Sequence, residues 1–172
     1  MFTCFDKAGV SLINVGLHCH LFNVAATVLN VLAEGYFLFL LALCLLLAKN
    51  NATKKTAILI LAGVTVVYQL THLIKELVGR PRPCFSMSNL YVLEKVKDCS
   101  FPSTTTAMAF MVAFLLSKRF KKPGIFYSLA ILVGITRIYS GVHYPTDVIA
   151  GAIVGVLIGY LLSALAKSFD ML

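Results

Sequence analysis

Three short clusters of polar residues interrupt an otherwise apolar chain. They cover residues 75–83, 101–106 and 136–147. The first supplies the cations Lys75, Arg80 and Arg82, the second a Pro-Ser pair of the kind that begins helices, and the third His143 with an aspartate four residues later. Cations, free amides at a helix N-terminus and a His–Asp pair are groups that bind a phosphate monoester and attack its phosphorus. The clusters therefore predict phosphate chemistry if they meet in space.

Each cluster by itself also has a structural interpretation. The cations of the first could extend to lipid headgroups, as long basic side chains do near a membrane surface. Ser103 could cap a helix, and Asp147 could complement the dipole of a helix that starts at Pro145. A functional site is favoured because all three clusters are predicted at the same membrane face.

The elements that must position these clusters are membrane helices. Of the 172 residues, 59% are hydrophobic and 13% are charged, and the mean hydropathy is +0.89. A soluble domain of this length cannot bury so much apolar surface. The formal net charge of +8 does not indicate a nucleic-acid partner, because most basic residues lie in short connectors where they set topology and contact headgroups. The expected partner is the lipid bilayer, and no protein partner is predicted.

The predicted fold class is all-α, a single membrane-embedded domain over residues 1–172 built as a polytopic helix bundle. Five apolar runs are expected to span the bilayer, at residues 28–48, 56–74, 103–117, 124–138 and 145–166. Residues 2–27 mix apolar and polar side chains and predict either an amphipathic interfacial helix or a weakly hydrophobic span. Glycines recur every four residues in the last run and predict close helix packing, at Gly151, Gly155 and Gly159.

The connectors predict the orientation. If the spans alternate, eight of the 15 lysines and arginines share one side, at Lys49, Lys54, Lys55, Lys118, Arg119, Lys121, Lys122 and Lys167. The excess of cytoplasmic basic residues in membrane proteins makes that side cytoplasmic. The three polar clusters fall on the opposite side, so the functional face is predicted to be periplasmic or extracellular.

The loop over residues 79–102 carries Cys84 and Cys99 near its two ends. On an oxidising face they could form a disulfide that stabilises the fold by roughly 3 kcal/mol in the chain-entropy model, and two reduced thiols are equally compatible with the sequence. Residues 18–20 are His-Cys-His without further ligands nearby, so no metal site is predicted. Glu34 lies within an apolar run and is either a functional acid or an interfacial acid near a helix end.

The spacing within the clusters resembles the type 2 phosphatidic acid phosphatase family. That family carries three motifs, Lys-x6-Arg-Pro, Pro-Ser-x-His and Ser-Arg-x5-His-x3-Asp. In this chain the first is matched completely, the second by half and the third with threonine for serine, at Lys75, Arg82, Pro83, Pro102, Ser103, Thr136, Arg137, His143 and Asp147. The motifs span residues 75–147, and the order of the apolar runs agrees with the family over most of the chain.

The resemblance implies a six-helix core and a role for each matched residue. His143 would be the nucleophile, forming a phosphohistidine that water hydrolyses, and Asp147 would hold its other ring nitrogen. The phosphate oxygens would be bound by Lys75, Arg82, Ser103 and Arg137. Arg80 lies outside the motif and is a candidate for contact with a headgroup. Family members use no metal or other cofactor, so none is expected.

One position departs from the family. The second motif has a histidine, which protonates the leaving oxygen, where this chain has Thr105. Threonine cannot donate that proton near neutral pH, and loss of a general acid costs about 10²–10⁴ in rate. Three interpretations are open: the chain is an inactivated variant, His72 one turn before Lys75 supplies the proton, or the leaving group needs little help, as when a pyrophosphate releases phosphate. The first is favoured because the other motif positions are nearly intact.

The function implied by the resemblance is that of a lipid phosphatase in the bacterial inner membrane with its active site facing the periplasm. Candidate substrates are phosphatidate, phosphatidylglycerophosphate, undecaprenyl pyrophosphate and the 1-phosphate of lipid A, and a short outward-facing chain favours the last three. The alternative is a non-catalytic membrane protein that binds lipid phosphate, an interpretation that Thr105 makes reasonable. A transporter is disfavoured because the chain has no internal repeat.

Overall fold

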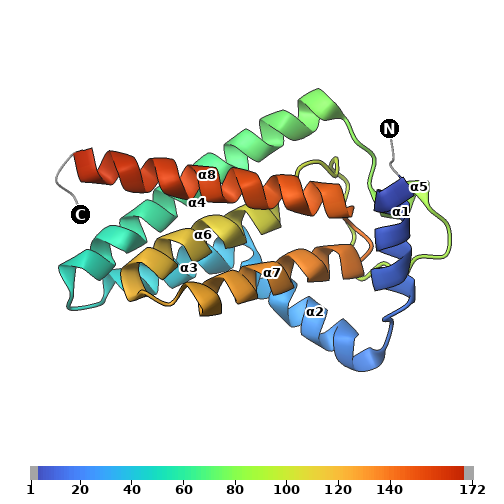
Figure 1. Cartoon of the computed structure of the whole chain (residues 1–172), viewed down its shortest axis with the longest axis horizontal. Helices are drawn as coiled ribbons and strands as arrows, with labels where there is room; N and C mark the ends of the chain where they lie inside the picture. The colour runs from blue at the N-terminus through green and yellow to red at the C-terminus, as the bar shows by residue number, and fades with distance from the viewer. Residues whose placement is uncertain (1–3, 169–172) are drawn as a thin grey trace.

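A computed structural model describes residues 4–168, and all regular structure in this part of the chain is helical (Figure 1). The elements are α1 (Cys4–Val10), a π-helical turn (Ser11–Val15), α2 (His20–Ala33), α3 (Gly35–Leu46), α4 (Asn51–Val78), α5 (Pro83–Ser86), α6 (Thr104–Phe120), α7 (Pro123–Tyr139) and α8 (Pro145–Ser168). The predicted all-α fold class is confirmed.

Helix α6 lies at the centre of the bundle and packs against α4, α7 and α8. Ala107, Met111 and Leu115 supply buried side chains from α6 to the core. The glycines of α8 face α6, and a Cβ atom on Gly155 would collide with the backbone of Ala107. Two helices can approach this closely only where a side chain is absent. The packing role predicted for the glycine stripe is therefore confirmed.

Three helix ends bring the polar clusters together. Helix α4 is capped by Gly79, whose φ of +61° is a left-handed conformation that glycine adopts without strain. Helix α6 is capped at its N-terminus by Ser103, whose hydroxyl accepts a hydrogen bond from the Thr106 amide. Helix α8 begins at Pro145, where the fixed φ of proline suits a first helical position. The three ends lie at one end of the bundle (Figure 1).

Two of the described helical segments are long and apolar enough to cross a membrane by length and composition, Asn51–Ser86 and α8. The pair Cys4–Val15 and His20–Ala33 is bent by 115° and would be a third if it forms one span. Helices α6 and α7 have 17 residues each, or about 26 Å, which is shorter than a hydrocarbon core of about 30 Å. The prediction of five spans is thus confirmed only in part.

The N-terminal region differs from the prediction. The helix expected over residues 28–48 is broken at Glu34, whose extended backbone (φ −65°, ψ 147°) separates α2 from α3. Helix α2 begins earlier, and α1 lies across the end of the bundle in contact with α8 (Figure 1). Two of the polar residues that interrupt the apolar pattern are internal, since Asp6 and Asn14 are buried and hydrogen-bonded, whereas Lys7 and His20 are exposed. Residues 2 and 3 of the predicted amphipathic segment lie outside the described residues.

Candidate active site

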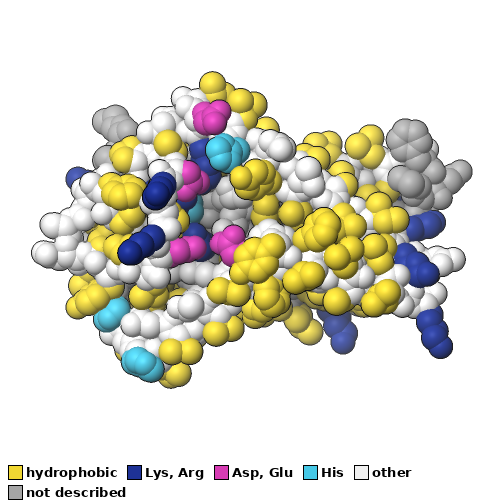
Figure 2. Space-filling model, turned by 180° about the vertical axis from the view of Figure 1, so that it is seen from behind, with side chains coloured by type: hydrophobic (Ala, Val, Ile, Leu, Met, Phe, Trp, Pro, Cys, Tyr) yellow, Lys and Arg dark blue, Asp and Glu magenta, His cyan; other side chains and the backbone are white. Residues whose placement is uncertain are grey.

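A cavity of about 970 Å³ lies at the end of the bundle where the three helix ends meet. One part of its wall is polar and contains the predicted phosphate-binding cations and His143. Another part is apolar, formed by Tyr36, Phe39, Leu40, Val64 and Met108. Figure 2 shows a hollow edged by acidic, basic and histidine side chains beside a wide hydrophobic band. A molecule with a charged head and an apolar tail fits this division.

The three predicted phosphate-binding cations all line the cavity. Lys75 lies in the last turn of α4, Arg82 immediately precedes α5, and Arg137 lies in the last turn of α7. Their exposed fractions are only 3–4%. Buried charges are stable only when they are paired. Partners come from the loop between α5 and α6, which supplies Glu94 and Asp98.

Asp98 bridges two of the cations. Its Oδ2 accepts a hydrogen bond from Lys75 Nζ at 2.6 Å, and its Oδ1 accepts one from Arg82 Nη2 at 2.6 Å. Arg137 Nη1 lies 2.8 Å from Glu94 Oε2. Partial burial acts to raise the pKa of Asp98, but the hydrogen bond from Lys75 and the charge of Arg82 outweigh it and lower this pKa to about 2. The loop carboxylates therefore neutralise the cations that a phosphate would need.

His143 lies in the connector between α7 and α8 and is 2% exposed. Its Nε2 is 3.0 Å from Arg82 Nη1, and its Nδ1 is 3.5 Å from Asp147 Oδ2. Because a guanidinium can only donate, Nε2 must accept, which assigns the proton to Nδ1 on the Asp147 side. Burial, with the charges of Arg82 and Arg137, holds the pKa of His143 well below its usual range. The imidazole is therefore neutral with a lone pair on Nε2, the form that attacks an electrophile.

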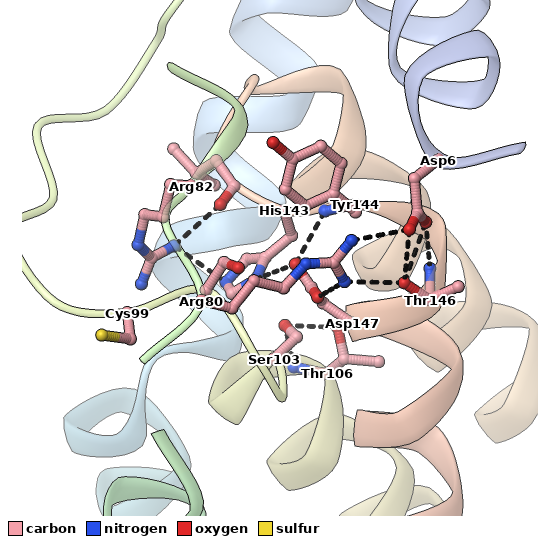
Figure 3. Close-up of polar contacts among 12 residues, drawn as sticks. Asp6, Arg80, Arg82, Cys99, Ser103, Thr106, His143, Tyr144, Thr146 and Asp147 are labelled. Carbon is pink, nitrogen blue, oxygen red and sulfur yellow. Dashed lines mark hydrogen bonds and ion pairs between the residues drawn. The ribbon is translucent and has the colours of Figure 1, made fainter. Parts of the chain in front are cut away.

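Arg80 has partners inside the protein, so its contact with a lipid headgroup stays a prediction that no contact of the structure supports. Its guanidinium is turned inward, where Nη1 donates to Asp147 Oδ1 at 2.5 Å and Nη2 donates to Asp6 Oδ2 at 2.6 Å (Figure 3). The guanidinium carbon also lies 4.2 Å from the centre of the Tyr144 ring. The physical reason is that two carboxylates with exposed fractions of 0% and 1% require a counter-charge inside the protein.

Ser103 and Thr105 take different positions at the start of α6. Ser103 is fully buried, with its hydroxyl 2.8 Å from the Thr106 hydroxyl and its amide donating to the Asp147 carbonyl at 3.1 Å. Its part in phosphate binding stays a prediction, since the residues that line the cavity include Thr105 but not Ser103. Thr105 thus lies in the cavity wall, and its place as that of a general acid stays a prediction.

The remaining candidates are His72 and the two cysteines. His72 lines the cavity one turn before Lys75, with its Nδ1 3.5 Å from Glu76 Oε1, and so stays a candidate proton donor. Cys84 and Cys99 are free thiols. Of the two states that the sequence left open, the structure therefore has the reduced one. Within residues 4–168 there is no group of three or more His, Cys, Asp or Glu side chains that could hold a metal ion.

The sequence matches the profile of the PAP2 superfamily over residues 54–169, which is more than half of the chain and contains all three polar clusters. The chain belongs to the PAP2 superfamily. The family predicted from motif spacing is thereby confirmed, and the apolar helices of this PAP2 protein identify it as an integral membrane protein.

Curated relatives of this PAP2 protein come from several bacteria. The bacitracin transport permease protein BcrC of Bacillus licheniformis is 34% identical over 142 residues, which cover 79% of this chain and 69% of the relative. The undecaprenyl-diphosphatase BcrC of Bacillus subtilis is 33% identical over 132 residues, which cover 74% of this chain and 65% of the relative. Other relatives are named lipid A 1-phosphatase and phosphatidylglycerophosphatase B. The first two relatives are therefore about half as long again as the part that this chain matches.

A solved structure supports the same assignment. The crystal structure of Aquifex aeolicus LpxE matches with a TM-score of 0.79 at 30% identity, covering 94% of this chain and 96% of that one.

Sequence reasoning about this PAP2 protein missed the acids of the site. Asp6, Glu94 and Asp98 belong to no motif, yet each pairs with a cation of the three clusters. The signal that could have found these acids is the small number of acidic residues in the chain. The chain has only seven acidic residues, and several buried cations at one site must draw their counter-charges from that small set.

Proposed function

We propose that this PAP2 protein removes a phosphate from a membrane lipid phosphate or pyrophosphate through a phosphohistidine on His143. The observation that carries the proposal is the buried, neutral imidazole with Nε2 beside Arg82, in the cation-lined part of a cavity whose other part is apolar. That arrangement suits an amphiphile whose phosphate enters the polar part while its tail remains against α3 and α4.

Binding begins with an exchange of anions. Lys75, Arg82 and Arg137 are each paired with Asp98 or Glu94 before substrate arrives. Phosphate oxygens have the charge and the acceptor capacity to replace these carboxylates, and bidentate contacts to arginine fix their orientation. As the loop acids move away, Arg82 turns from His143 to the phosphate and frees the Nε2 lone pair.

The chemistry then has two steps. His143 Nε2 attacks phosphorus, a phosphorus–nitrogen bond forms, and the phosphorus–oxygen bond to the lipid breaks, with the leaving oxygen taking a proton. The positive charge that develops on the ring is stabilised by Asp147, whose Oδ2 faces Nδ1. Water next attacks phosphorus, so the phosphorus–nitrogen bond breaks, inorganic phosphate leaves and the neutral imidazole is restored.

The leaving group decides how much Thr105 matters. An alkoxide must be protonated as it leaves, and a threonine at this place in the cavity wall gives no acid of suitable strength. We propose that the chain is impaired toward lipid monoesters for this reason, unless His72 supplies the proton. A pyrophosphate is affected less, because phosphate leaves readily without help.

The substrate classes proposed for this chain follow from the cavity and from its relatives. Undecaprenyl pyrophosphate, phosphatidylglycerophosphate and the 1-phosphate of lipid A each join a phosphate to long apolar chains, and relatives are named for each. We place the cavity at the periplasmic face of the bacterial inner membrane. The support is the charge distribution, since basic side chains gather at the end of the bundle opposite the cavity (Figure 2).

Phosphate release tests the catalytic proposal. The unsubstituted chain and its Thr105→His and His143→Gln variants are assayed in detergent micelles with a lipid monoester and a lipid pyrophosphate. We expect Thr105→His to raise monoester turnover by about 10²–10⁴-fold and to change pyrophosphate turnover less. His143→Gln should abolish both, whereas His20→Gln, at an exposed histidine remote from the cavity, should change neither. Turnover that survives His143→Gln would eliminate the phosphohistidine.

A second candidate function is non-catalytic binding of a lipid phosphate, which the presence of Thr105 in the cavity wall favours. It predicts that inorganic phosphate binds tightly and that Thr105→His still gives no turnover of either substrate. The same assay series therefore separates the two functions.

The proposed orientation is tested by labelling. Single cysteines are introduced at Lys95, in the loop at the cavity, and at Lys121, at the opposite end, in a chain whose own cysteines are replaced by serine. A maleimide that cannot cross membranes should label Lys95→Cys but not Lys121→Cys in spheroplasts. The reverse pattern would place the cavity at the cytoplasmic face.

A further inference from the structure

We propose that Arg80 and Asp6 are positioning residues that hold Asp147 against His143, so that the N-terminal helix α1 supports the active site. This inference rests on the proposed role of His143. Neither residue belongs to the three motifs, and α1 lies outside residues 54–169 matched by the PAP2 profile. The contacts that link them are drawn in Figure 3.

The Asp147 carboxylate is held at both oxygens. Oδ1 accepts a hydrogen bond from Arg80 Nη1 at 2.5 Å, and Oδ2 accepts one from the Tyr144 amide at 2.9 Å. Oδ2 is also the oxygen that faces His143 Nδ1, at 3.5 Å. With both oxygens fixed, the plane of the carboxylate cannot rotate freely. The orientation of Asp147 Oδ2 toward the His143 imidazole therefore depends on the hydrogen bond that Arg80 donates to Oδ1.

Arg80 is in turn fixed from the other side. Its Nη2 donates to Asp6 Oδ2 at 2.6 Å, while Nη1 also donates to the Thr146 hydroxyl at 2.7 Å. Asp6 Oδ1 accepts hydrogen bonds from the Thr146 amide at 3.1 Å and the Thr146 hydroxyl at 2.8 Å. The guanidinium lies over the Tyr144 ring. Asp6 and Thr146 thus fix the position of the Arg80 guanidinium, and the same guanidinium binds Asp147.

The chemistry of this chain of contacts suits positioning better than simple attachment of α1. Attachment alone needs only apolar contacts, and replacing a buried ion pair by well-packed apolar residues is often neutral or stabilising. Here two carboxylates with exposed fractions of 0% and 1% converge on one guanidinium that is 11% exposed. A catalytic pair needs its geometry fixed more closely than the fold does, and misplacement by about 1 Å can cost about 10²-fold in rate.

The test compares graded variants of the two residues. Arg80→Gln removes the positive charge and the paired Nη1 and Nη2 donors. Arg80→Lys keeps the charge without the paired donors, and Asp6→Asn removes the negative charge but keeps the shape of the side chain. We expect Arg80→Gln to lower kcat by about 10²-fold with little change in KM, and Asp6→Asn and Arg80→Lys to lower it by about tenfold. Lys7→Gln, at an exposed neighbour of Asp6 on α1, is the matched control and should leave kcat unchanged.

A second background separates positioning from a structural role. If Arg80 and Asp6 act through Asp147, then Arg80→Gln and Asp6→Asn should lower kcat by less than about twofold when Asp147 is already asparagine. A merely structural pair would cost the same factor in either background. Equal losses in both backgrounds would overturn the proposal, and so would an unchanged kcat in Arg80→Gln.

The tautomer of His143 gives a readout that needs no turnover. The chain has four histidines, and nitrogen-15 NMR of labelled protein in micelles distinguishes a proton on Nδ1 from one on Nε2. We expect His143 to carry its proton on Nδ1 in the unsubstituted chain and in Lys7→Gln, and to show a mixture of tautomers in Arg80→Gln and Asp6→Asn. A single unchanged tautomer in both variants would contradict the positioning role. If instead the tautomer shifts but no form of the chain turns over, the proposed function fails while the positioning stands.

Discussion

Removing the Asp98 carboxylate should make this PAP2 protein bind phosphate more tightly. Asp98 joins Lys75 and Arg82 at 2.6 Å each, so a phosphate can use these two cations only after Asp98 has left. Asp98→Asn keeps the size of the side chain and removes its charge. The variant therefore tests whether the carboxylate competes with the ligand or helps to build its site.

The magnitude follows from the pKa of Asp98. Its fall from the ordinary value of 3.8 to about 2 corresponds to about 2.4 kcal/mol in favour of the ionised form. The side chain is 44% exposed, and solvent screening reduces the recoverable part to about 1 kcal/mol. We therefore expect the Kd for phosphate to fall about fivefold in Asp98→Asn.

Calorimetric titration of inorganic phosphate into the protein in micelles measures this change at neutral pH. Glu76→Gln is the matched control, because it removes the same charge at a side chain that is 71% exposed and that pairs with His72. Its Kd should change by less than about twofold, as expected for a solvent-screened charge. If Asp98→Asn weakens phosphate binding, Asp98 holds Lys75 and Arg82 in place for the ligand and the competition argument is refuted.

Three further predictions concern stability, each measured as Tm in micelles. Because the pKa of Asp98 is depressed, its ion pairs stabilise the fold above pH 3.8 and lose this effect as the pH falls through about 2. The Tm difference between the unsubstituted chain and Asp98→Asn should therefore vanish over that interval. Gly155→Ala should cost about 1–3 kcal/mol by pushing α8 off Ala107, whereas Gly124→Ala, which meets open space, should cost nothing. Asn14→Leu should cost about 3 kcal/mol, because the buried Asn14 amide bonds to backbone groups of two other segments.

The parts of the site that the sequence could predict are those with a local signal. Lys75, Arg82 and His143 lie near helix ends. Gly79 and Pro145 are residue types that end and begin helices, so the sequence itself indicates where two of these ends fall. The periodic glycines likewise predicted a close helix contact that the structure contains. In each case the residue type and its neighbours decide the outcome without reference to distant segments.

The parts that the sequence could not predict depend on contacts between distant segments. Arg80 was assigned to headgroups because nothing near it in the sequence suggests a buried partner, and its partners Asp6 and Asp147 lie 74 and 67 residues away. The break at Glu34 was missed for a related reason. Hydropathy predicts one apolar run there, but cannot say whether a helix continues through an acid or bends to place it in a cavity wall.

The acids of the site fall into two classes that differ in exposure. Asp98 and Glu94 are 44% and 33% exposed and pair with the cations that line the cavity, so water and an incoming phosphate can replace them. Asp6 and Asp147 are 1% and 0% exposed and pair with Arg80, where no ligand can take their place without leaving a buried charge unpaired. Exchangeable partners should therefore govern affinity, and permanent partners should govern the rate of the chemical step. On this argument a variant at Asp98 changes Kd or KM, a variant at Asp6 changes kcat, and a variant that reversed the two effects would show that the division by exposure does not hold.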